Sequence, residues 1–151
     1  MQKIVFILFI GTLAALSSCK KEEGVDVLAF EPSIEIVSLN TTNLIEFDDS
    51  LIITLKYEDG DGDLGRFDPD ENSLYIKDSR LSKAEYYHIP PILADDDNLQ
   101  TTGKIRVFIP TLFILGTDPV EKAEISLKVR DQAGNWSNEV KTGNITINRK
   151  N

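Results

Sequence analysis

Ala123-Glu124-Ile125-Ser126-Leu127-Lys128-Val129-Arg130 is the stretch that decides the fold, because apolar and polar residues alternate along its whole length. Side chains of a β-strand point alternately to its two faces, so this pattern places one face in a core and the other in solvent. Residues 51–57 alternate in the same way. The two segments predict half-buried strands of an antiparallel sheet.

Weaker segments with the same period of two bring the predicted number of strands to about seven. No window of a dozen residues carries a helical stripe, and the best candidate, 118–123, is a single turn. Clusters of Gly, Pro, Asn and Asp separate the short strands. The sequence therefore predicts an all-β fold, an antiparallel β-sandwich. The predicted strands are 34–39, 51–57, 74–77, 85–89, 104–109, 123–131 and 145–148.

The first eighteen residues predict a lipoprotein signal peptide. Lys3 supplies a positive start, and residues 4–16 form an apolar stretch shorter than the about 20 residues that cross a bilayer. The segment Leu16-Ser17-Ser18-Cys19 resembles the lipobox of bacterial lipoproteins, in which a cysteine after small residues is acylated. The resemblance implies a lipid anchor on Cys19, and the alternative is an ordinary cleaved leader followed by an incidental cysteine.

The residues after the cysteine predict where the anchored protein goes. Lys20-Lys21-Glu22-Glu23 resembles the signal that directs some Gram-negative lipoproteins to the outer face of the outer membrane. The alternative is a solvated charged tether. We expect three parts: a signal peptide at 1–18, the lipidated cysteine with a flexible tether at 19–32, and the sandwich domain at 33–151. The protein would be lipid-anchored in the bacterial outer membrane, at the cell surface, and would touch the membrane through its lipid alone.

Composition and charge restrict the partners. Apolar residues make up 41% and charged residues 27%, as in an ordinary globular protein. The chain carries 16 basic and 25 acidic residues, a net charge of −9, and loss of Lys3 with the leader would make it −10. Such a surface repels nucleic acid and anionic lipid, and it favours cations or basic partners.

Two motifs carry a resemblance to a family. Residues 129–138, Val-Arg-Asp-Gln-Ala-Gly-Asn-Trp-Ser-Asn, resemble the strand and turn that close bacterial immunoglobulin-like and fibronectin type III-like domains. Residues 57–65, Tyr-Glu-Asp-Gly-Asp-Gly-Asp-Leu-Gly, are similar to a loop of small surface lipoproteins of that kind. The resemblance implies an immunoglobulin-like sandwich in which the loops after the second, fourth and sixth strands meet at one end.

Those three loops hold nine aspartates, with Arg66 and Arg130 as nearby cations. Neighbouring carboxylates repel one another, and Ca²⁺ relieves this because it takes six to eight hard oxygen ligands. The alternating Asp-Gly pattern at 59–63 therefore predicts a calcium site. The aspartates are Asp59, Asp61, Asp63, Asp68, Asp70, Asp95, Asp96, Asp97 and Asp131, and the predicted ligands are Asp59, Asp61, Asp63, Asp131 and Asn135.

Alternatives to a calcium site remain open. An EF-hand loop starting at Asp59 needs Gly and Glu at its sixth and twelfth positions, where this chain has Leu64 and Asp70. The Asp-Gly repeat is equally typical of turns on a solvated loop. Asp131 would then bind backbone amides of its own turn, with Asn135 in a left-handed conformation.

Two further residues are candidates for surface roles. Trp136 beside the closing turn could contact a ligand or cover the end of the core. Asp49-Ser50-Leu51 resembles the acceptor at which some Gram-negative envelope proteins are O-glycosylated, which would place a sugar on Ser50.

Catalytic residues are missing from the pattern. Every Ser-His-Asp or Cys-His arrangement would need His88, the chain's one histidine, which lies in a predicted strand, while Cys19 is assigned to lipid. We expect no enzyme. The leading hypothesis is a binding or structural module with protein or glycan partners. One alternative is an accessory subunit of an outer-membrane complex. The other is a small carbohydrate-binding or carbohydrate-active domain. The accessory subunit would dock through an edge strand or through one face bearing Ile52, Tyr75 and Phe108.

Overall fold

The computed structural model describes residues 28–93 and 100–150, and within them the fold is all-β. These residues include no helix, and so none that could span a membrane. Their strands are β1 (Ser33–Leu39), β2 (Asn43–Ile45), β3 (Leu51–Asp59), β4 (Asp63–Leu64), β5 (Leu74–Asp78), β6 (Glu85–Tyr87), β7 (Ile92–Leu93), β8 (Thr101–Ile109), β9 (Val120–Ala123), β10 (Ile125–Val129), β11 (Val140–Lys141) and β12 (Ile145–Asn148).

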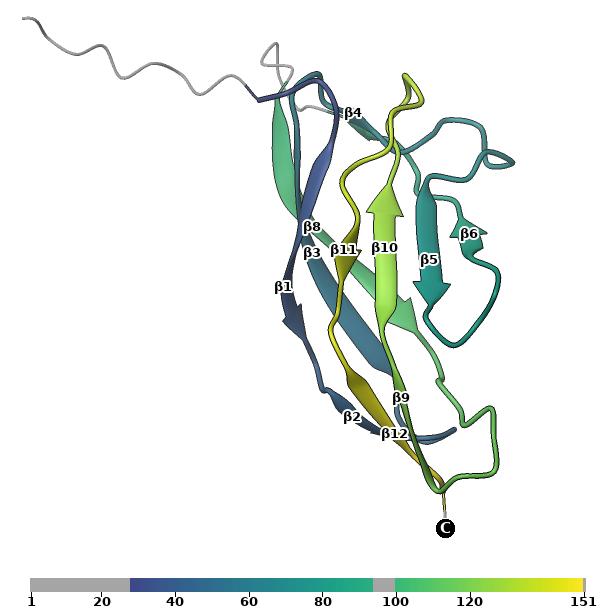
Figure 1. The fold of residues 1–151 in the computed structure, drawn as a ribbon. Coiled ribbons are helices and arrows are strands. Elements are labelled where there is room, and N and C mark those ends of the chain that lie inside the picture. Colours follow the sequence, from purple (N-terminus) through teal and green to yellow (C-terminus); the bar gives the residue numbers. More distant parts are fainter. Residues whose placement is uncertain (1–27, 94–99, 151) are drawn as a thin grey trace, which may run out of the picture.

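The strands lie in two layers that face each other, which is consistent with the predicted β-sandwich (Figure 1). The rear layer is a sheet in the order β1-β3-β8, and all its pairs are antiparallel. The front layer contains the sheet β11-β10-β5-β6 and, below it, the sheet β2-β12-β9. The β2–β12 pair is parallel, so the expectation of a wholly antiparallel fold is wrong at that edge.

The core forms where the inward rows of the two layers meet. In β3 the residues Leu51, Ile53 and Leu55 are fully buried, and in β10 the same is true of Leu127. Each fully buried aliphatic side chain contributes roughly 1.5–3 kcal/mol to folding. The alternation seen in the sequence is therefore the pattern that builds this core.

The predicted strand 123–131 is two strands in the structure. β9 pairs with β12, and β10 pairs with β5 and β11. The register moves by one residue between them, because Ser126 pairs with Lys141 whereas Ala123 pairs with Ile145. Alternation continues through the break, since Ala123 and Ile125 are both buried, and for this reason the sequence pattern did not reveal it.

Each of the other predicted strands overlaps an observed one, but the count of seven merges β9 with β10 and omits β2, β4, β7 and β11. These four omitted strands have two or three residues, which is too few for a period of two to stand out. The prediction that Ile52, Tyr75 and Phe108 share a face is also wrong. Ile52 pairs with Phe108 in the rear layer, whereas Tyr75 lies on β5 in the front layer.

The three loops expected at one end do meet. β4 pairs with β7, which joins the loop after β3 to the loop after β6. An isolated bridge between Leu64 and Asp131 joins both to the loop after β10. Figure 1 shows this end at the top, where the chain also enters the described region at Leu28.

Candidate metal centre

The position of Asp59 follows from the period of strand β3. Leu51, Ile53, Leu55 and Tyr57 all point inward and are buried, so the next residue in that row, Asp59, points inward too. Its side chain is fully buried. A strand that ends on an inward aspartate thus delivers a carboxylate to the rim of the core.

Two glycines turn the chain back immediately after Asp59. Gly62 has a φ of 66°, in the left-handed region that favours glycine. At Gly60 a Cβ atom would lie 2.4 Å from the carbonyl oxygen of Ala29, so no side chain fits there. This tight turn brings the carboxylates of Asp61 and Asp63 back towards Asp59.

The three carboxylates, which we call the aspartate triad, form an oxygen cluster. One carboxylate oxygen each of Asp59, Asp61 and Asp63 lies within 4.8 Å of the others. The Oδ1 atom of every member is buried and has no hydrogen-bond partner among residues 28–93 and 100–150. Buried polar atoms are nearly always paired, so three orphaned oxygens in one place indicate a missing partner. A cation is the partner that suits carboxylates.

The triad also accepts a hydrogen bond from the backbone. The N–H of Asp63 donates to Oδ2 of Asp59 at 2.9 Å. Among the ion pairs of residues 28–93 and 100–150, none includes a member of the triad. The cluster thus holds several acidic groups without an internal cation.

Burial and mutual repulsion alter the protonation of the triad. Burial raises the pKa of Asp59 to about 7, and nearby Asp61 and Asp63 act in the same direction against the lowering effect of the Asp63 N–H. Burial also raises the pKa of Asp63, followed by the charges of Asp61 and Asp131. Holding all these carboxylates ionised is therefore costly unless a positive charge is added.

Asp131 and Asn135, two of the predicted ligands, bind each other instead. Asp131 is fully buried, and its Oδ1 accepts the backbone N–H of Asn135 at 2.7 Å while its Oδ2 accepts the side-chain N–H of Asn135 at 2.9 Å. Asp131 therefore has the turn-holding role that was its alternative prediction. The left-handed conformation expected at Asn135 is wrong, since Gly134 adopts it with a φ of 96°.

The other charged residues of this end lie apart from the triad or are already engaged. Asp68 and Asp70 are exposed, and Asp68 accepts the N–H of Asp70 at 2.9 Å in a turn of its own. Arg66 pairs with Glu71 and donates to the carbonyl oxygens of Asp131 and Gln132. Arg130 donates to the carbonyl oxygen of Gly134. The predicted residues Asp95, Asp96 and Asp97 lie outside the described residues.

Thr101 is a neighbour of the triad that sequence reasoning missed. It pairs directly with Asp59 across β3 and β8, which places the two side chains on the same face. Its Oγ1 is a further buried oxygen for which the described residues offer no hydrogen-bond partner. The register between two strands some forty residues apart carries no local sequence signal, so this oxygen could be found only in the folded structure.

Trp136 lies on the outer face of the front layer. Its ring contacts Tyr86 at 6.3 Å between centroids, and Tyr86 contacts Tyr75 at 5.5 Å. The Nζ atom of Lys128 lies over the rings of Tyr75 and Trp136, at 4.7 and 5.4 Å from their centroids. Trp136 therefore does not close the end of the core, and its ligand contact stays a prediction.

Of the two modification sites predicted from the sequence, Cys19 and Ser50, the structure describes only Ser50. Cys19 lies outside the described residues, as do the signal peptide and most of the tether. Ser50 is half-buried just before β3, and its hydroxyl donates to the carbonyl oxygen of Pro110 at 2.9 Å.

His88, the histidine that any Ser-His-Asp or Cys-His arrangement would need, is held by a contact of 3.0 Å between its Nδ1 and the carbonyl oxygen of Glu71.

No family model, curated protein or solved structure matches this chain.

Proposed function

We propose that this chain is a non-catalytic, lipid-anchored envelope protein whose immunoglobulin-like sandwich binds Ca²⁺ at the aspartate triad. The observation that carries the proposal is the convergence of three buried, unpartnered Oδ1 atoms on Asp59, Asp61 and Asp63. The ion would order the end of the domain that lies next to the anchor.

The chemistry of the donors favours calcium over other divalent ions. Ca²⁺ prefers oxygen ligands in a flexible geometry, and carboxylates with a neighbouring hydroxyl, that of Thr101, offer such ligands. Mg²⁺ requires a near-ideal octahedron and keeps several waters. Zn²⁺ prefers nitrogen and sulfur, which the triad lacks.

The site is coupled to the point where the chain enters the domain. The N–H of Gly60, between two members of the triad, donates to the carbonyl oxygen of Ala29 at 2.8 Å. Figure 1 shows residues 28–32 running over this end before they continue into β1. A bound ion would stiffen that junction and so fix the angle between the domain and a tether attached at Cys19.

The strand order supports the immunoglobulin-like assignment. Constant-type domains place the first, second, fourth and fifth main strands in one sheet and the third, sixth and seventh in the other. The orders β1-β3-β8 and β11-β10-β5 follow that arrangement, whereas the fourth main strand, β6, pairs with β5 and so lies in the second sheet.

Thermal unfolding of the whole chain, purified in detergent, tests the calcium site. An ion at 100 times its dissociation constant adds about 2.7 kcal/mol to the free energy of unfolding, which raises the midpoint by several degrees. We expect millimolar Ca²⁺ to do this relative to EDTA, and Mg²⁺ to do less. Equal midpoints in EDTA and in calcium would contradict the calcium function.

Membrane fractionation of a Cys19→Ser variant tests the anchor separately. Wild-type protein should sediment with membranes and take up labelled fatty acid. The variant should take up no label, because the acylated thiol is gone. A variant that incorporates label as wild type does would refute the anchor and leave the calcium proposal untouched.

A further inference from the structure

A groove of about 540 Å³ opens between the two layers, between the β5–β6 hairpin and β8. Its walls are mostly apolar, with Leu74 and Ile76 of β5 on one side and Ile105, Val107 and Ile109 of β8 on the other. Pockets with such volumes and linings are the usual sites of ligand or partner binding.

The groove follows the backbone edge of β8. Five consecutive residues, 105–109, line it although their side chains alternate between two faces. β8 pairs with β3 on one side, and no described strand pairs with its other side. The backbone N–H and C=O groups of that free edge can accept another strand.

The core is also less covered at β8 than at β3. The inward residues Leu51, Ile53 and Leu55 of β3 are fully buried, whereas the inward Ile105 and Ile109 of β8 are half-buried. A strand added along β8 would cover these side chains and complete the apolar layer.

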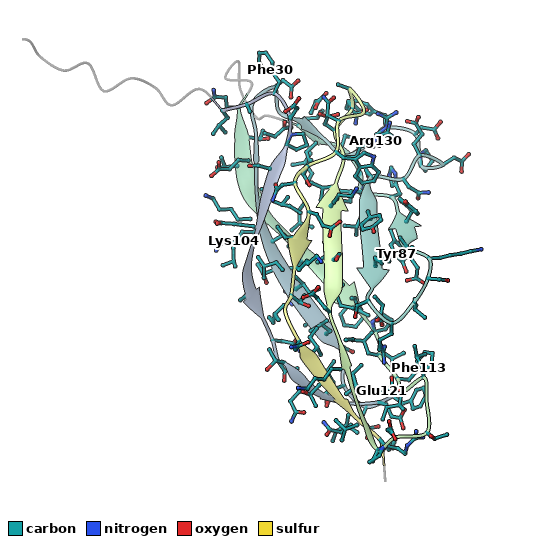
Figure 2. The ribbon with its side chains drawn as sticks, viewed as in Figure 1. Phe30, Tyr87, Lys104, Phe113, Glu121 and Arg130 are labelled. Atoms are coloured by element: carbon teal, nitrogen blue, oxygen red, sulfur yellow. The ribbon has the colours of Figure 1, made fainter. Side chains whose placement is uncertain are left out.

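Charges on the outer face of the rear layer indicate what that strand would carry. Lys56 of β3 has Glu58 at 2.5 Å and Glu35, on the neighbouring β1, at 3.8 Å. Lys104 lies directly opposite Lys56, and Lys104 and Arg106 have no acidic partner within the described ranges. Figure 2 shows Lys104 on the outer side of this layer. The free edge thus lacks the acids that β1 provides on the opposite edge.

We propose that the free edge of β8 and its groove bind an extended segment of a partner protein in which acidic and apolar residues alternate. The apolar side chains would enter the groove beside Ile105 and Val107, and the acids would lie next to Lys104 and Arg106. This is recognition by strand addition, in which backbone bonds give affinity and alternate side chains give specificity. The inference specifies the partner of the proposed binding module, and it does not depend on calcium.

Other occupants fit the same observations less well. A second copy paired through β8 would bring the Lys104 and Arg106 side chains of both copies together, and like charges on adjacent strands destabilise pairing. A small apolar molecule would leave the backbone edge and both cations without partners.

Fluorescence anisotropy with synthetic peptides tests the proposal on the whole chain in detergent. The probe is a labelled octapeptide of alternating Val and Glu, and its counterpart has Lys in place of Glu. We expect saturable binding of the acidic peptide and at least about tenfold weaker binding of the basic one. Arg106→Glu should weaken binding of the acidic peptide about tenfold. Lys122→Glu, the same reversal of charge at an exposed site on β9, should leave binding unchanged.

Backbone N-methylation of the acidic peptide separates strand addition from simple charge attraction. Two versions carry methyl groups on alternate residues, in the two possible registers. Only one set of N–H groups can face β8, so one version should lose binding and the other should retain it. Equal binding of both versions, or an Arg106→Glu variant that binds like wild type, would overturn the proposal.

Two further outcomes would also overturn it. One is an apolar dye that binds in the groove while the acidic peptide does not bind, and the other is a dimer in sedimentation that Arg106→Glu dissociates. The titrations are made in EDTA and again in calcium. If the peptide does not bind but calcium still raises the melting midpoint, only the docking site is refuted. If the peptide binds but calcium does not raise the midpoint, only the calcium site is refuted.

Discussion

Two clusters of acidic side chains at different places in the molecule differ in how their negative charges are balanced. Asp78 and Glu121 share an internal cation, because Arg80 pairs with Asp78 at 2.6 Å and with Glu121 at 2.9 Å. Within the part of the chain that the structure describes, the aspartate triad has no such cation and keeps three oxygens without a hydrogen-bond partner. Figure 2 labels Glu121 near the lower end, away from the upper end where the triad's turn lies.

The pKa shifts of the two clusters run in opposite directions. The N–H groups of Leu115 and Gly116, together with Arg80, lower the pKa of Glu121. Burial and neighbouring carboxylates raise the pKa of Asp59. We infer that the first cluster is complete as folded and serves stability, while the second is incomplete and depends on an ion from solution.

The largest expected effect comes from removing the internal cation. Arg80→Met should lower the free energy of unfolding by about 3 kcal/mol, because it leaves the partly buried carboxylates of Asp78 and Glu121 without their cation. Urea denaturation measures this, and the loss should be the same in EDTA and in calcium. Lys122→Met, at an exposed lysine that forms no ion pair with another described residue, should change stability by less than about 0.5 kcal/mol. Equal effects of the two substitutions would remove the contrast between the clusters.

The next effect concerns the triad itself. Asp61→Asn removes one repelling charge, so in EDTA it should leave stability unchanged or raise it by about 1 kcal/mol. In calcium it should abolish the rise in midpoint, because a ligand carboxylate is lost. Asp68→Asn, at an exposed aspartate in a turn of its own, is the matched control and should keep the full calcium response. A normal calcium response in Asp61→Asn would show that the ion binds elsewhere.

The third prediction concerns the pH dependence of stability, and its sign differs with and without calcium. The pKa of Asp59 is about 7 in the folded state and 3.8 by its ordinary value, so the folded protein binds more protons between these limits. Lowering the pH from about 8 to 5 should therefore make Asp59 stabilise the calcium-free protein. Calcium needs the ionised form, so its contribution to the midpoint should shrink over the same range.

Melting curves at several pH values in EDTA and in calcium check this prediction. Asp59→Asn provides the control, because its pH profile should be flatter in EDTA and insensitive to calcium. A calcium response that grows as the pH falls would contradict a carboxylate site.

The sequence predicted the parts of the fold that depend on local periodicity. Alternation located β3 and β10, but it ended the first of these strands at Tyr57 and left Asp59 in the following loop, whereas β3 runs to Asp59 and buries its carboxylate. The same alternation concealed the change of partner at Glu124, because it is satisfied on both sides of the break. Local pattern fixes which way a side chain faces, but it does not fix which strand lies beside it.

The candidate site was predicted to the same extent. The Asp-Gly repeat identified the triad, but the pairing of Asp131 with Asn135 and the position of Thr101 depend on turn geometry and strand register. The groove beside β8 follows from the absence of a neighbouring strand in the described region, which no single segment encodes. Contacts between distant segments therefore account for what sequence reasoning missed.

Equilibrium dialysis of the whole chain against radioactive calcium tests the central claim most directly. The account predicts one ion bound per chain at neutral pH, no measurable binding to Asp61→Asn, and unchanged binding to Asp68→Asn. No bound calcium at millimolar concentration, or equal binding to wild type and Asp61→Asn, would contradict it.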